Sequence, residues 1–181
     1  MAGRVTRRRF LRLGLAGGAL LAAGGVFALH TGGYVLDERT RRRLRFFDQK
    51  GYRVFEAFAD RALDGCTPTA REVDVVGFVD GFVATMDART RGDLHKLLGL
   101  LEHGTLLGDS VRRFTALGSA EKDGYLAGWE SSRLVVKRTG FSALKALAML
   151  GYYRDSRAFA AIGYPGPIVP RGFDVYAGRP R

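Results

Sequence analysis

The sequence predicts an all-α protein, with a single compact helical domain preceded by an N-terminal apolar helix and followed by an irregular tail. Three observations support this fold class. Apolar residues recur at spacings of three and four over most of 49–162, which is the pattern of helices with one buried face. Runs with the strand period of two are nearly absent. Residues 163–181 hold four of the five prolines together with four glycines, a composition that disfavours any regular element.

The first element joins a run of arginines directly to an apolar stretch. Six residues follow the (S/T)-R-R-x-F-L-K pattern of bacterial twin-arginine export signals, with arginine in place of the lysine: Thr6, Arg7, Arg8, Phe10, Leu11 and Arg12. The 17 uncharged residues from Leu13 to Leu29 then have the length of a signal's apolar region. We therefore predict a twin-arginine signal peptide over 1–28, cut after Ala28. If it is left uncut, the segment would anchor the chain in the membrane.

A basic linker is predicted over 29–46, with the run RTRRRLR at 39–45. The whole chain carries a net charge of +11, but residues 1–28 hold five basic and no acidic residues, so the remainder carries about +6. No aromatic residue interrupts the basic run, which favours a solvated or phospholipid-facing segment over a nucleic-acid site. We predict no nucleic-acid partner.

The helical domain is predicted over 47–162, and its first half contains three amphipathic segments. The first helix is expected over 49–63, with Asp48 as its N-cap. Thr69 and Glu72 have the spacing of a capping box, which predicts that a second helix begins there and carries an apolar stripe from Val75 to Met86. A third helix is expected over 88–103, with leucines on one face.

The second half of the domain is expected to contain a short helix around 109–117 and a longer helical region opening at Ser119. That region is either two helices or one bent helix, with Gly128 and Gly140 as candidate bends. Its core-facing seam is predicted to contain Leu134, Phe141, Leu144 and Ala148. A last short helix is expected from 155 to 161, and an extended tail over 163–181.

Motifs for cofactor and metal binding are missing from the sequence. No two glycines are two residues apart and no glycine precedes a lysine, which excludes the dinucleotide fingerprint and the phosphate-binding loop. A single cysteine excludes cysteine-rich metal sites, and His95 and His103 lie two helical turns apart. Most carboxylates, with Asp74 and Asp80 considered first, are expected to be solvated. We therefore predict no catalytic residue, cofactor or metal in this chain.

The single cysteine, Cys66, cannot form a disulfide within the chain. Either it is a partly buried, unreactive thiol or it bridges to a partner subunit, and the sequence leaves both alternatives open.

Most of the chain after the predicted signal resembles the gluconate 2-dehydrogenase subunit 3 family, over about 47–167, and the C-terminal part of the likeness is the more specific. The resembling pieces are Gly128-Trp129 with Ser132-Arg133, Phe141 with Leu144 and Lys145, Tyr152-Tyr153-Arg154-Asp155, and Gly163-Tyr164-Pro165-Gly166-Pro167. The resemblance implies a small, non-catalytic subunit that accompanies an FAD-dependent oxidoreductase of the glucose-methanol-choline type. It would bind that large subunit, aid its maturation and carry it through the twin-arginine translocase on a shared signal.

The same resemblance implies that FAD lies in the partner, that a cytochrome c subunit is a further candidate partner, and that the complex is periplasmic. Interface residues would then matter most. The candidates are Cys66, Trp129, Tyr152, Tyr153, Arg154, Tyr164, Pro165 and Pro167, with the core of the helical domain as the alternative location for Trp129 and the tyrosines. The alternative function is a freestanding exported helical protein that binds a small ligand or a membrane component.

Overall fold

The computed structural model describes residues 33–107, 112–166, 173–174 and 179–180. Its contacts divide the chain into two units, Met1–Leu36 and Asp37–Arg181. In the first unit the described residues, 33–36, form neither helix nor strand. The predicted signal residues from Thr6 to Arg12 lie outside the described residues, so the signal peptide stays a prediction.

The described part of the second unit is helical, which confirms the predicted all-α class. Its α-helices are α2 (Glu38–Arg43), α3 (Gln49–Ala62), α4 (Val75–Ala84), α5 (Ala88–His103), α6 (Ser119–Glu130) and α7 (Val135–Tyr153). Short 3-10 helices cover Gly104–Leu107, Phe114–Ala116, Ser156–Ala158 and Ala160–Ile162. Helix α2 lies inside the segment that the sequence presents as a basic linker, with the side chain of Asp37 accepting from the backbone N–H of Thr40 at its start.

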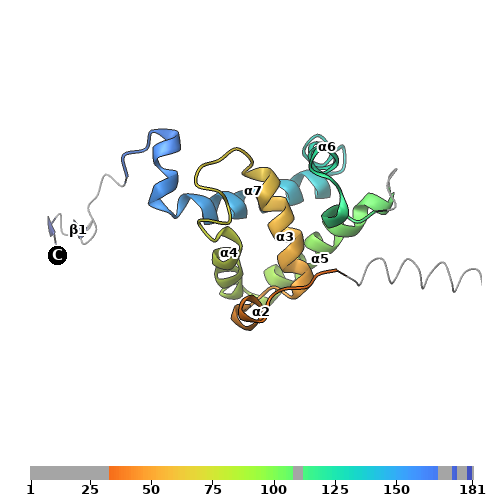
Figure 1. Ribbon diagram of the computed structural model, residues 1–181, viewed down its shortest axis with the longest axis horizontal. Coiled ribbons are helices and arrows are strands. Elements are labelled where there is room, and N and C mark those ends of the chain that lie inside the picture. Colours follow the sequence, from red (N-terminus) through yellow and green to blue (C-terminus); the bar gives the residue numbers. More distant parts are fainter. Residues whose placement is uncertain (1–32, 108–111, 167–172, 175–178, 181) are drawn as a thin grey trace, which may run out of the picture. The chain divides into compact units, whose positions relative to one another are not determined.

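Helix α3 packs against α4, α5, α6 and α7, and it runs through the middle of these helices in Figure 1. It begins as predicted, with the Asp48 side chain accepting from the backbone N–H of Gly51 at 2.6 Å. Its buried face contains Phe55 and Phe58, which are fully buried. The Phe58 ring meets the Phe141 ring of α7 edge-on, with centroids 5.9 Å apart. The hydrophobic core is therefore organised around α3 and the inner face of α7.

The second predicted helix begins later than its capping box indicates. Thr69 and Glu72 do pair, with the backbone N–H of Thr69 donating to Glu72 Oε2 at 2.6 Å, but residues 70–74 form a turn. Asp74 has a left-handed backbone (φ 50°), which interrupts any helix running through it, and its side chain caps α4 by accepting from the N–H of Gly77. The box thus closes a turn, while Asp74 starts the helix. Helix α5 has the predicted bounds, 88–103.

The region opened by Ser119 is two helices, and the break between them lies at neither candidate glycine. The break falls at 131–134, where serine side chains bond to the backbone. Ser131 Oγ donates to the carbonyl of Ala127, and Ser132 Oγ accepts from the N–H of Leu134. Such local bonds compete with the helical pattern and end it. Leu134 is 58% exposed and so does not belong to the predicted seam, whereas Phe141, Leu144 and Ala148 are buried.

Three smaller differences concern short segments. Instead of a helix over 109–117, the described residues there show a 3-10 turn at Phe114–Ala116, held by the buried Phe114. Residues 155–161 likewise form 3-10 turns. Within the predicted tail, Phe173–Asp174 and Arg179–Pro180 pair as two-residue antiparallel strands. Over the part of the chain that the structure describes, no helix is both long and apolar enough to span a membrane.

Candidate partner interface

An apolar groove lies between α5 and α7, with a volume of about 780 Å³. We call it the α5–α7 groove. Helix α5 contributes Leu94 and Leu97 to its wall. Helix α7 contributes a row of residues at alternating spacings of four and three: Val136, Gly140, Ala143, Leu147 and Leu150. The few polar groups in its lining include Thr90, Asp93 and Thr139.

Small residues of α7 make the groove concave. At Gly140 the Leu97 side chain of α5 reaches the α7 backbone, because a Cβ there would overlap Leu97 Cδ1 and approach the Trp129 ring at 3.3 Å. Ala143 and Ala146 continue the floor, while Val136 and Leu150 stand at its ends with 58% and 44% of their surface exposed. Val135 also lines the groove, and Leu134 and Met149 are further exposed apolar residues at the N-cap and on α7. An exposed apolar surface of this kind is a candidate site for contact with a protein, a ligand or a membrane.

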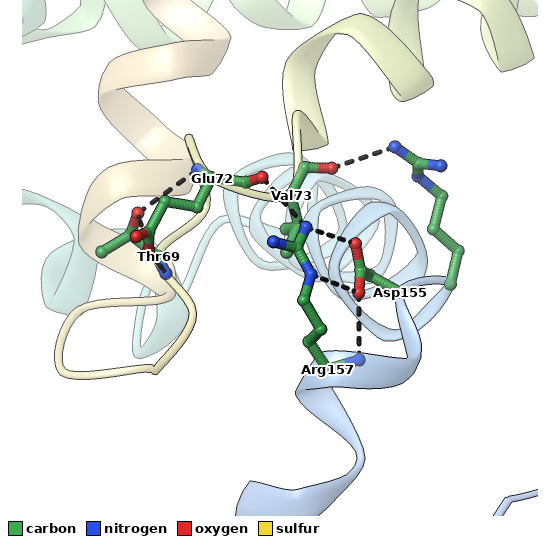
Figure 2. A network of polar contacts seen from close by, with 6 residues as sticks. Thr69, Glu72, Val73, Asp155 and Arg157 are labelled. Atoms are coloured by element: carbon green, nitrogen blue, oxygen red, sulfur yellow. Dashed lines mark hydrogen bonds and ion pairs between the residues drawn. The ribbon is translucent and has the colours of Figure 1, made fainter.

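Polar bonds hold the C-terminal end of α7, and Figure 2 shows them around the turn at 69–74. Arg157 Nη2 donates to the carbonyl of Glu72 at 3.1 Å, and the Arg157 guanidinium pairs with both oxygens of Asp155. Hydrogen bonds from Arg157 lower the pKa of Asp155 to about 2. Arg154 Nη2 donates to the carbonyl of Val73 at 2.9 Å. These residues therefore tie the chain after α7 to the turn before α4.

Two of the predicted interface aromatics lie in the core. Trp129 and Tyr152 each have 1% of their surface exposed, so the structure gives them the alternative location, inside the helical domain. Burial first, and then the neighbouring Cys66 thiol, raise the pKa of Tyr152. Tyr153 is half-buried and meets the Tyr152 ring edge-on at 5.2 Å. Trp129 and Tyr152 are therefore core residues, whereas Tyr153 keeps part of its surface accessible.

The remaining candidates are at least partly accessible. Arg154 is exposed but engaged, since its guanidinium bonds to Val73 and lies 4.8 Å above the Phe78 ring. Cys66 is a free, half-buried thiol. Tyr164 is 42% exposed and packs edge-on against Phe159, and Pro165 is exposed. Pro167 lies outside the described residues. None of these candidates lines the α5–α7 groove, which sequence reasoning did not single out.

Two buried carboxylates, Asp80 and Glu102, were not predicted from the sequence. Asp80 is 3% exposed and accepts from the backbone N–H groups of Arg45, Phe46 and Phe47 at 2.7 to 3.0 Å. Asp80 is therefore an exception to the expectation that most carboxylates are solvated. Glu102 is fully buried and accepts from the N–H and the hydroxyl of Thr115. A signal for Asp80 existed, because it lies four residues after Val76 and three before Val83, on the buried face of α4.

The described residues hold no group of three or more histidine, cysteine, aspartate or glutamate side chains that could bind a metal ion. The described residues of the second unit thus form a helical domain with an open apolar groove between α5 and α7. The family model described as gluconate 2-dehydrogenase subunit 3 matches residues 49–166, most of this domain. The chain therefore belongs to that family. No curated protein and no solved structure matches it.

Proposed function

We propose that this chain is the non-catalytic small subunit of a membrane-associated or periplasmic FAD-dependent alcohol or sugar dehydrogenase. It binds the flavoprotein subunit of the glucose-methanol-choline type, supports its maturation and accompanies it through the twin-arginine translocase. The observation that carries this proposal is the uncovered apolar row of α7 in a chain whose family is described as a dehydrogenase subunit. FAD is held by the partner, and electrons leave through a cytochrome c subunit or another acceptor.

The shape of the α5–α7 groove specifies what the partner contributes. Spacings of four and three along one side are those of a helix that packs against another helix. Small residues at the floor allow a partner helix to approach the α7 backbone closely, while Val136 and Leu150 flank it. We infer that an apolar helix of the flavoprotein lies in this groove, anchored by side chains at alternating spacings of three and four.

In this proposal a single export signal serves both subunits. Twin-arginine export carries folded proteins, and a flavoprotein that must fold around FAD before crossing requires such a route. One signal, on residues 1–28 of the small subunit, then serves both chains. This step rests on the sequence of the signal and on the proposed contact at the groove.

The test is a charge placed in the groove. Ala143 is exposed and lines the groove, so Ala143→Arg leaves the core intact but buries an unpaired charge against the partner. We expect at least about a tenfold loss of flavin-absorbing partner co-purified from the native envelope. Ser142→Arg is the matched control, because Ser142 is the exposed neighbour that does not line the groove.

Equal recovery of the flavoprotein with both variants would contradict the groove as the interface, provided that both keep the wild-type circular dichroism. A second candidate function rests on the same groove, whose volume is that of a small-molecule site. If the purified chain is colourless, lacks a partner and carries a bound apolar compound that Ala143→Arg expels, the freestanding ligand-binding protein is correct instead.

A further inference from the structure

A second groove, between α2 and α4, has a different chemistry and no part in the proposed flavoprotein contact. It has a volume of about 770 Å³ and is lined by three arginines of the basic run: Arg42, Arg43 and Arg45. We call it the arginine groove. Helix α4 forms its floor with Gly77 and Gly81, and no atom lies within 4 Å of the position that a Cβ on Gly81 would take. The groove is therefore open to a ligand between the arginines and the helix.

Much of the positive charge here is not neutralised within the described residues. Arg41 and Arg42 share one partner, Glu38, at 2.6 and 2.7 Å. The exposed side chains of Arg39, Arg43 and Arg45 make no hydrogen bond or ion pair with any residue in the described ranges.

Two carboxylates also line the groove, but both are occupied by the backbone. Asp80 accepts three backbone N–H groups, and Asp74 caps the start of α4. Asp80 is thus buried and turned to backbone amides, and Asp74 is the exposed carboxylate that lines the groove beside the three arginines.

An aromatic pair with one exposed ring adjoins the arginines. Phe78 and Phe82 stack with ring centroids 6.0 Å apart, both line the groove, and Phe82 is 37% exposed. Basic side chains beside an exposed aromatic ring are the combination that holds a protein at a lipid interface, because the cations attract phosphate and the ring enters the headgroup layer. In the sequence, Arg39 comes only ten residues after Leu29, the end of the uncharged apolar stretch.

We propose that the arginine groove binds the phosphate groups of anionic phospholipids, so that the folded domain itself docks on a membrane surface whether or not the signal is cut. Clusters of four or more basic residues next to a membrane-directed segment bind such surfaces with an energy that grows with each added cation. A solvated linker would be indifferent to the lipid. The docking described here requires Arg43 and Arg45 in particular, since they lack an acidic partner in the described part of the chain.

The experiment measures binding of the full chain to vesicles of phosphatidylcholine, with and without about one third phosphatidylglycerol. Any insertion of the apolar N-terminal segment contributes to the affinity for both kinds of vesicle. The ratio of the two affinities therefore measures the contribution of the anionic lipid. We expect the double variant Arg43→Gln/Arg45→Gln to lower that ratio by about tenfold or more, and raised salt to do the same in the wild type. The matched control, Lys96→Gln/Arg133→Gln, removes the same charge from exposed positions on other elements and is expected to keep the ratio.

Three results would overturn the proposal. The first is a wild-type ratio near one, and the second is a double variant that binds anionic vesicles like the control. The third is displacement by glycerol phosphate at matched ionic strength, which would make the groove a site for a small free phosphate compound. The vesicle assay contains no flavoprotein, so its failure leaves the proposed subunit function intact. If the double variant binds vesicles like the wild type but recovers less flavoprotein in the co-purification from the envelope, the arginines belong to the protein interface instead.

Discussion

The two apolar rows of α7 have nearly the same sequence pattern and opposite surroundings. One row, Phe141, Leu144, Ala148 and Tyr152, is buried against the rest of the domain. The other row, which runs from Val136 through Ala143 to Leu150, lines an open groove. A helix in a small domain usually buries one apolar face against the core, so a second apolar face remains exposed. The difference teaches that apolar spacing alone does not place a row in the core, and the second row is the one that we propose contacts the partner.

The largest effect that sharpens this comparison comes from truncating one leucine of each row. Leu144 is fully buried, so Leu144→Ala should lower the free energy of unfolding by about 2–5 kcal/mol through lost burial and a cavity. Leu147 is half-buried at the groove, so Leu147→Ala should cost less than about half of that in the isolated chain. Urea unfolding of both variants measures the difference.

The order should reverse when binding is measured. Leu147→Ala is expected to reduce recovery of the flavoprotein more than its small loss of stability explains. If the two truncations destabilise the isolated chain equally, the groove row is already part of the core, and the comparison between the two rows fails.

A second effect concerns how closely the buried face of α7 approaches α4. A Cβ on Gly151 would lie 3.0 Å from Val75 Cγ1 and 3.1 Å from the Val75 carbonyl, which is backbone and cannot move aside. Gly151→Ala should therefore cost about 1–3 kcal/mol of stability. Gly128→Ala is the control, because nothing lies within 4 Å of its Cβ position and alanine favours a helix by up to about 1 kcal/mol over glycine. Thermal unfolding of the two variants should shift in opposite directions.

Local signals in the sequence predicted the helices, and tertiary contacts decided the rest. The bounds of α5 and the cap of α3 at Asp48 depend on neighbouring residues alone, and both are confirmed. The Thr69–Glu72 box also formed, but the left-handed backbone of Asp74 moved the helix start to Val75. In this segment the capping signal therefore predicted the hydrogen bond but not the start of the helix.

The candidate site was harder to predict because spacing does not say which apolar face is covered. Aromatic residues favoured Trp129 and Tyr152 as interface residues, yet both lie in the core, where large rings bury the most area. The groove is lined instead by Gly140, Ala143 and other small residues, which carry no interface signal on their own. Only the packing of α5 beside α7 shows that this row remains open.

The smallest expected effect tests the hydrogen bonds that tie the C-terminal end of α7 to the turn at 69–74. Within the described residues, the apolar side chains of the open groove make no such polar bonds, so the two regions are held differently. The Asp155 carboxylate pairs with Arg157, which reaches the Glu72 carbonyl, so Asp155→Asn should lower the Tm by loosening this tie. The folded-state pKa of about 2 lies below the ordinary value of 3.8. The ionised carboxylate therefore contributes its stabilisation above pH 3.8 and loses it as the pH falls through about 2. The Tm gap between wild type and variant should accordingly be full at neutral pH and close over that interval.

Asp93→Asn is the control, since Asp93 pairs with Lys96 within one turn of α5 and joins no separate segments. A gap that stays constant down to pH 2 would mean that the geometry of the turn, and not the charge of Asp155, holds the end of α7 against the 69–74 turn.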